Sequence, residues 1–143
     1  MRQFDAYRKA TVDTSDNVKL VSLLFDGAVN FLKVARGKME QRDIAGKGIY
    51  IGKATAIVGE LSSSLNMEEG GEIARNLRRL YDFVLGRLLH ANLKNDMKAL
   101  NEAERVLETL RQGWKEMEQN QAAAHAAAYQ ASAGTGARMA VQA

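Results

Sequence analysis

Apolar residues recur at alternating intervals of three and four in four segments of this chain, and this spacing constrains the fold most. A helix has 3.6 residues per turn, so such a row lies on one side of an α-helix and forms a seam with another helix. In the first segment, about residues 16–41, the row is Val18, Val21, Phe25, Ala28, Leu32, Ala35 and Met39. Rows over about 43–66 (beginning at Ile44), 72–93 and 96–120 predict three more helices. With short links, these segments predict an all-α, antiparallel four-helix bundle.

The residue types that are missing agree with this prediction and exclude several protein classes. The chain has no proline, which breaks helix interiors, and no cysteine, which excludes a disulfide scaffold. A net charge of +3 over 143 residues gives little reason to expect nucleic-acid binding. The longest strongly apolar stretch, Leu20–Phe25, is far shorter than the roughly 20 residues that cross a bilayer. The start of the chain leads into no apolar run, so we expect no signal peptide, no membrane insertion and a cytoplasmic protein.

The last part of the chain differs in composition from the four seams. Of the 23 residues in 121–143, eleven are alanine, and Arg138 is the only charged residue. Such a segment has little apolar surface to bury, so burial does not offset the conformational entropy that the segment would lose on folding. We therefore predict a helical bundle domain over 1–120, with a short N-terminal lead segment, and a disordered tail over 121–143.

A second apolar stripe accompanies the seam of the first helix. Its members are Leu20, Leu24, Phe31 and Val34. One stripe is enough to dock a helix, so two imply either a helix central in its bundle or apolar surface that is left over. The lead segment, with Phe4 and Tyr7, could cover such a surface as a lid, contact a partner directly, or be an ordinary frayed end.

The second helix carries a row of small residues beside its seam. The row consists of Gly48, Gly52, Thr55, Gly59 and Ser62. Each glycine inside a helix costs about 1 kcal/mol relative to alanine, so the row should have a packing or binding role. Two interpretations are open: close contact with a neighbouring helix of the bundle, or a groove for a partner.

The polar residues form no recognisable catalytic constellation. His90 has no glutamate three residues before it, so the Glu-x-x-His pairs of di-iron bundles are missing. Asp26 follows an apolar run and is interpreted as a hydrogen-bonding residue at the core boundary. Trp114 lies on the fourth seam and is expected in the core. We predict no catalytic residue, no metal and no cofactor.

Four arginines cluster on the third helix: Arg75, Arg78, Arg79 and Arg87. We interpret them as a solvated face, partly paired with Glu72 and Asp82. The alternative is contact with phosphates or with acidic residues of a partner.

Several short motifs follow one another along the chain. They include Ala6-Tyr7-Arg8-Lys9, Leu24-Phe25-Asp26-Gly27-Ala28, Ser64-Leu65-Asn66-Met67-Glu68, Gly70-Gly71-Glu72-Ile73-Ala74, Leu80-Tyr81-Asp82-Phe83, Ala91-Asn92 and Lys94-Asn95-Asp96. In this order they resemble the flagellar secretion chaperone family, FliS, over about residues 4–117. The chain departs from the family pattern at Asp16, where proline is frequent, and at Phe25, where tyrosine is common.

The resemblance implies a function as well as a fold. Members are antiparallel helical bundles of the bacterial cytoplasm that bind the C-terminal segment of flagellin. They prevent early polymerisation of flagellin and assist its delivery to the flagellar export gate. They do so without catalysis or a cofactor. We expect the same fold and the same function for this protein, with a possible homodimer. The alternatives are a helical adaptor or export chaperone for a different partner, or a bundle enzyme or cofactor carrier. We expect the partner to contact Tyr7, Leu20, Leu24, Phe31, Gly52, Thr55, Gly59, Tyr81 and Asn92.

Overall fold

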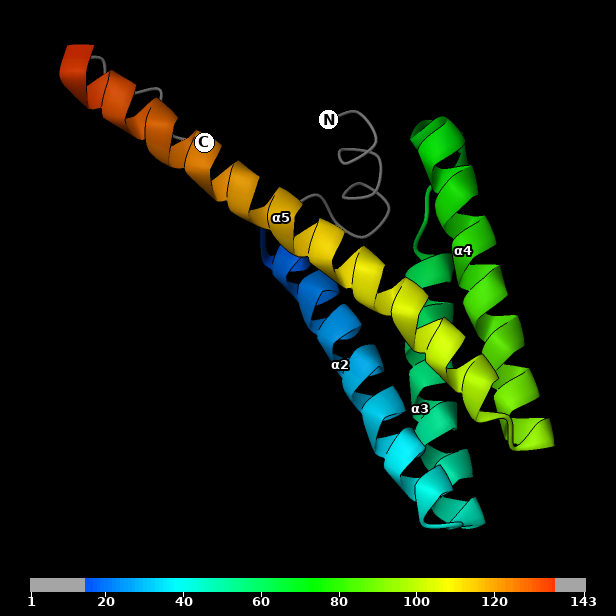
Figure 1. The fold of residues 1–143 in the computed structure, drawn as a ribbon. Coiled ribbons are helices and arrows are strands. Elements are labelled where there is room, and N and C mark those ends of the chain that lie inside the picture. Colours follow the sequence, from blue (N-terminus) through cyan, green and yellow to red (C-terminus); the bar gives the residue numbers. More distant parts are fainter. Residues whose placement is uncertain (1–14, 136–143) are drawn as a thin grey trace. The chain divides into compact units, whose positions relative to one another are not determined.

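Four α-helices make up the described part of the chain. In this computed structural model the backbone is described for residues 15–135 and the side chains for residues 18–120. The helices are α2 (Ser15–Glu40), α3 (Ile44–Ser63), α4 (Met67–Lys94) and α5 (Met97–Thr135), and residues 15–135 contain no strand (Figure 1). The all-α prediction is confirmed. The chain divides into two units at Arg111–Gln112, inside α5.

The first unit is a four-helix bundle in which successive helices run in opposite directions (Figure 1). The central pairs are formed by α3, which packs on both α2 and α4. Polar contacts join the beginning of α5 to the other two helices. Arg36 of α2 forms an ion pair with Glu104, and its Nε donates to Asn101 Oδ1 at 3.1 Å. Arg87 of α4 pairs with Glu102 at 2.9 Å. Each helix therefore has two neighbours in the bundle.

Side-chain caps explain where three of the helices begin. The first N–H groups of a helix have no partner within the helix, and a capping side-chain oxygen accepts from them. Asp43 accepts from Gly46 N at 2.9 Å at the start of α3. Asn66 accepts from Glu68 N and Glu69 N before α4, and Asp96 accepts from Lys98 N before α5. These caps hold the connections short, as the antiparallel arrangement requires.

The core follows the predicted seams over most of their length, and Ile44 is the clearest departure. All seven predicted residues of α2 are buried, as are Ile51, Ala54, Val58 and Leu61 of α3. The prediction for Ile44 is wrong, because this residue begins α3 and is 58 % exposed. Lys47, only 3 % exposed, takes the seam position one turn later. Trp114 of α5 is buried, as expected.

Two helix boundaries differ from the sequence prediction. The expected break before Glu72 is present as a kink, since the backbone of Gly71 is non-helical with φ 56° and ψ −134°. However, α4 already begins at Met67, one turn before that kink. The fourth helix was expected to end near residue 120, but α5 continues to Thr135. Alanine has the highest helix propensity, and helical hydrogen bonds are local, so the helix can continue without a seam.

The disorder predicted for residues 121–143 stays a prediction, because the side chains of these residues lie outside the described part of the chain. The lead segment before residue 15 lies outside the described residues as well. Within the described residues, no helix combines the length and the apolar character that a membrane span requires.

Candidate partner-binding surface

Apolar surface remains exposed on the bundle in the described part of the chain. The large apolar side chains with substantial exposure are Leu20, Leu23, Ile44, Ile49, Leu80, Phe83, Leu89 and Leu93. Leu20 is 50 % exposed, and the other members of its stripe on α2 are half-buried. Of the two interpretations of the second stripe, the structure therefore supports surplus apolar surface.

The first apolar face lies where α2 meets α3. The spacing of Leu20, Leu24 and Phe31 places them on one side of α2. The ring of Phe31 meets Tyr50 of α3 with the centroids 6.0 Å apart and the planes tilted by 43°. Lys53 Nζ lies 5.7 Å from the Phe31 centroid, within the range of a cation–π interaction. We call these five residues the α2–α3 face.

The second face lies on the opposite flank of α3, beside α4. A Cβ atom at Gly48 would lie 3.9 Å from Asn92 Oδ1, which shows that the small-residue row borders α4 at this end. At Gly52 and Gly59, a Cβ atom would meet no atom of the described residues within 4 Å. The row is therefore open rather than tightly packed at these two positions. Leu89, 60 % exposed, lies one turn before Asn92 on α4.

We call the row together with its α4 neighbours the α3–α4 face. Its members are Gly48, Gly52, Thr55, Gly59, Leu89 and Asn92. An open glycine on α3 would give the backbone of an incoming segment room to approach, and the exposed Leu89 of α4 offers apolar area to bury. Close packing against a neighbouring helix is therefore not met at Gly52 and Gly59, and the groove for a partner stays a prediction.

The predicted contact residues fall into three groups. Leu20, Leu24 and Phe31 lie on the α2–α3 face, while Gly52, Thr55, Gly59 and Asn92 lie on the α3–α4 face. Tyr81 belongs to neither face. Its side chain is 0 % exposed because it occupies the seam of α4 together with Val84 and Leu88. A direct contact between Tyr81 and a partner would require α4 to move. Tyr7 lies outside the described residues.

One buried residue near the α3–α4 face was missed by sequence reasoning. Lys47 Nζ donates to the backbone oxygen of Asn92 at 3.0 Å and to Asn95 Oδ1 at 3.3 Å. A cation is favourable at a helix C-terminus, where carbonyl groups have no partner within the helix. Lys47 therefore ties the start of α3 to the end of α4. Its spacing from Ile51 and Ala54 was the available signal, since all three fall on one side of the helix.

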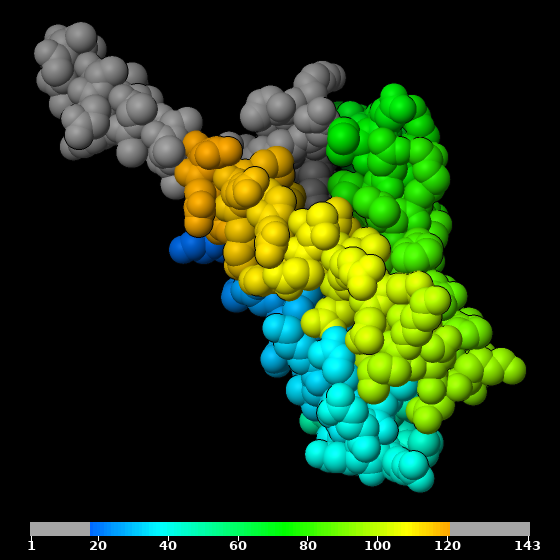
Figure 2. All heavy atoms as spheres, in the orientation of Figure 1, coloured from blue at the N-terminus to red at the C-terminus, as the bar shows by residue number. Residues whose placement is uncertain are grey.

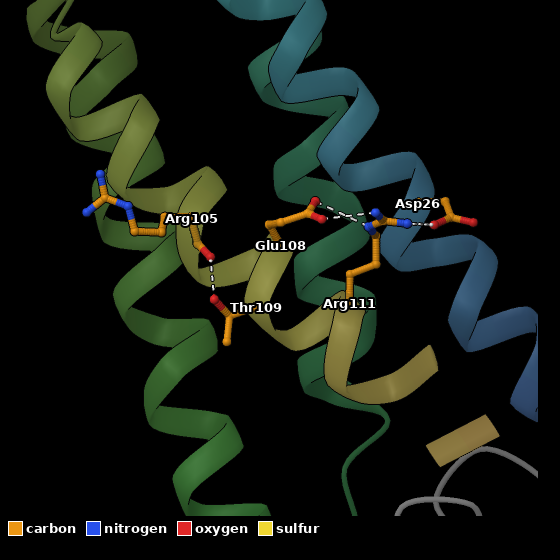
Figure 3. Close-up of polar contacts among 5 residues, drawn as sticks. All are labelled: Asp26, Arg105, Glu108, Thr109 and Arg111. Atoms are coloured by element: carbon orange, nitrogen blue, oxygen red, sulfur yellow. Dashed lines mark hydrogen bonds and ion pairs between the residues drawn. The ribbon is translucent and has the colours of Figure 1, made fainter. Parts of the chain in front are cut away.

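A polar cluster joins α2 and α5 (Figure 3). Arg111 Nη1 donates to Asp26 Oδ1 at 3.0 Å, and Nη2 donates to Glu108 Oε2 at 2.9 Å. The hydrogen bonds to Glu108 and then to Asp26 raise the pKa of the Arg111 guanidinium, and partial burial opposes this rise. Asp26 is therefore a boundary residue with an ion-pair partner, as expected. Beside this cluster is a cleft of about 450 Å³, lined by Asp26, Gly27, Val29, Asn30, Lys33 and Arg111.

The histidine of the bundle has an ordinary polar partner. His90 Nε2 lies 3.2 Å from Asp96 Oδ2, at the link between α4 and α5. Among the side chains of residues 18–120, no group of three or more histidine, aspartate or glutamate residues is arranged to hold a metal ion. Of the four clustered arginines, Arg87 pairs with Glu102 of α5, a partner that the sequence did not indicate.

Comparison with known proteins agrees with the resemblance that the order of the motifs indicates. Residues 1–121 match the family model described as flagellar protein FliS. The chain is 42 % identical over 106 residues to the flagellar secretion chaperone FliSB of Pseudomonas aeruginosa, covering 74 % of this chain and 84 % of that protein. It is 44 % identical over 100 residues to the flagellar secretion chaperone FliS of Salmonella typhimurium, covering 69 % and 74 %. The Bacillus subtilis chaperone of the same name is 30 % identical over 118 residues, covering 82 % and 87 %. The chain therefore belongs to the FliS family of flagellar secretion chaperones.

Proposed function

We propose that this protein is a cytoplasmic chaperone that binds the C-terminal segment of flagellin, keeps it from polymerising early and assists its delivery to the flagellar export gate. The observation that carries the proposal is the pair of apolar faces on the two flanks of α3. Both faces consist of exposed or half-buried residues. The α3–α4 face also includes two glycines, Gly52 and Gly59, at which a Cβ atom would meet open space. Membership of a family of flagellar secretion chaperones supports the choice of cargo.

The mode of binding follows from the chemistry of the faces. An amphipathic segment can place apolar side chains against leucines such as Leu20 and Leu89, and its backbone can approach α3 over Gly52 and Gly59. Such a segment becomes ordered only when it binds, so part of the interaction free energy offsets the entropy of ordering. Burial of these apolar side chains would leave a cargo segment unable to assemble with other copies. The proposed activity is binding.

A large side chain placed on the α3–α4 face tests whether the partner binds there. Gly52→Leu places a large side chain where a Cβ atom meets no described residue, so the bundle should fold as before. The new side chain would occupy the space of the incoming backbone, and we expect the affinity for a peptide of the flagellin C-terminal segment to fall about tenfold or more. Isothermal titration of the full chain measures the affinity, and circular dichroism checks the fold.

The matched control is Gly113→Leu, at an exposed glycine of α5 that also has open space in the described structure. This variant should bind the peptide like the unchanged protein. Equal affinity of folded Gly52→Leu and Gly113→Leu would rule out the α3–α4 face as the binding surface. Failure of the unchanged protein to bind the peptide at all would instead favour an adaptor or chaperone for a different partner.

A further inference from the structure

The cleft beside Arg111 lies on the flank of the first unit where α2 meets α5. This flank is in view in Figure 2, where α2 is blue and the part of α5 near residue 110 is yellow. The cleft has a volume of about 450 Å³. Arg111 is its lining residue from α5, and all the others come from α2. The cleft therefore shares no lining residue with the α3–α4 face.

The charges of the cleft leave one ammonium group without a counterion. Arg111 is engaged by two carboxylates, because it donates to Asp26 at 3.0 Å and to Glu108 at 2.9 Å (Figure 3). Lys33 is exposed and has no ion-pair partner among the side chains of residues 18–120. The exposed side chain of Asn30 has no hydrogen-bond partner within the same residues. The cleft thus offers an unpaired cation and an amide to a ligand.

These two groups fit a carboxylate. The lysine ammonium and the asparagine NH₂ group both donate hydrogen bonds, whereas an ionised carboxylate only accepts them. Hydrogen bonds between a cation and a carboxylate are stronger than those between neutral groups. A single negative charge suits the cleft better than the double charge of a phosphate group, because Arg111 is already paired and only Lys33 remains to balance it.

The cleft borders the α2–α3 face through Gly27. This residue lines the cleft, and it lies between Leu24 and Phe31 on the same side of α2. A Cβ atom at Gly27 would lie 3.4 Å from Ile57 Cδ1, so the glycine also borders α3. Gly27 presents no side chain to a segment that passes from the face to the cleft. An extended or helical segment on the α2–α3 face can therefore place its end in the cleft.

We propose that this cleft binds the terminal α-carboxylate of the cargo, with Lys33 and Asn30 as its hydrogen-bond donors. The inference rests on the proposed function, in which the cargo segment is the C-terminal one and so ends in a free carboxylate. It adds a second, polar site to the apolar faces. Capture of the chain end would fix the direction and the register of the segment along α2, which apolar contacts alone define poorly.

Two forms of one peptide test the site in the full chain. The peptide of the flagellin C-terminal segment is prepared with a free carboxylate and with a C-terminal amide, and isothermal titration gives both affinities. We expect amidation to weaken binding about threefold to tenfold, because it removes a charge-assisted hydrogen bond at an exposed site. A negative charge at a helix C-terminus is unfavourable, so without the cleft amidation would strengthen the binding of a helical segment.

A substitution in the cleft links this difference to Lys33. In Lys33→Gln the two peptides should bind equally, with the affinity that the amidated peptide has for the unchanged protein. The matched control is Lys19→Gln, at an exposed lysine of α2 almost four turns earlier, which should keep the full difference between the peptides. The difference should also decrease at high salt. Circular dichroism should show that both variants fold.

The outcomes separate this inference from the proposed function. Equal binding of the two peptides to the unchanged protein overturns the carboxylate site and leaves flagellin binding intact. A difference that persists in Lys33→Gln overturns it as well, because another group then senses the chain end. Equal weakening of both peptides by Lys33→Gln would assign Lys33 to an acidic side chain of the cargo instead of its terminus. Absence of binding by either peptide contradicts the proposed function, and the site falls with it.

Discussion

Asp96 links its ionisation to the start of α5, because its side chain caps this helix and faces His90. Its Oδ1 accepts from Lys98 N at 2.9 Å and from Ala99 N at 3.3 Å, and its Oδ2 faces His90 at 3.2 Å. The hydrogen bond from the Ala99 amide is the largest cause that lowers the pKa of Asp96 from its ordinary value of 3.8. Desolvation opposes it, and the Lys98 amide and the charges of His90 and Arg87 lower the pKa further.

This lowered pKa predicts a pH-dependent contribution to stability. A carboxyl group whose pKa is lower in the folded state stabilises the fold above its ordinary pKa, and the contribution is lost as the pH falls through the folded value. Asp96→Asn keeps a capping oxygen but removes the charge. We expect the variant to be less stable than the unchanged protein at pH 7, with the difference shrinking steadily once the pH falls below 3.8. Urea unfolding of both proteins across this pH range measures the difference between their free energies of unfolding. A difference that is constant with pH would contradict the lowered pKa of Asp96.

At the scale of the helix, the glycines of α3 and α4 occupy different backbone environments. Gly52 and Gly59 have helical neighbours on both sides and open space where a Cβ atom would lie. Gly71 has φ 56°, which side chains other than glycine rarely adopt, and it separates the first turn of α4 from the rest of the helix. The same substitution should therefore have opposite effects in the two helices.

Alanine scanning of these glycines tests the difference. Gly52→Ala and Gly59→Ala should each raise the free energy of unfolding by about 0.5–1 kcal/mol, because alanine loses less conformational entropy in a helix. Gly71→Ala should lower it by about 1–2 kcal/mol, because a Cβ atom disfavours positive φ. Urea unfolding gives all three values. Stabilisation by Gly71→Ala would show that the kink does not exist in solution.

At the scale of the whole molecule, a few polar contacts between residues far apart in sequence place α5 on the bundle. Arg111 and Asp26 are 85 positions apart, and their hydrogen bond joins α5 to α2 (Figure 3). Arg36 with Glu104 and Arg87 with Glu102 bring the same helix to α2 and to α4. The seams provide most of the burial, while these pairs join residues 97–111 of α5 to α2 and to α4.

A double-mutant cycle measures one of these contacts. Asp26→Ala, Arg111→Ala and the double variant should give a coupling free energy of about 0.5–1 kcal/mol, because the pair is only partly exposed to water. The coupling should decrease at high salt. Glu108→Ala with Arg111→Ala is the matched comparison, since that pair lies within α5 and does not join two helices. Zero coupling between Asp26 and Arg111 would mean that the contact does not hold α5 in place.

Much of the fold could be predicted because its determinants are local. The predicted seam of α2 and the predicted break before Glu72 depend on residues within a few positions of each other, and so do the caps that the structure shows at Asp43, Asn66 and Asp96. Helical hydrogen bonds and caps span only three or four residues, so periodicity and residue type are sufficient to locate them. The extension of α5 past residue 120 is also local, but it was missed because alanine forms helix without a seam.

What the tertiary structure alone decided is which residue is buried where two candidates lie on the same side of a helix. Periodicity places Ile44 and Lys47 on nearly the same side of α3, and apolar character favours Ile44. The buried position goes to Lys47, because the end of α4 brings the oxygens of Asn92 and Asn95 within reach of its ammonium group. Tyr81 likewise lies in a motif of the family but is covered by the helices packed against it. Such choices depend on contacts between residues far apart in the chain, which local periodicity does not contain.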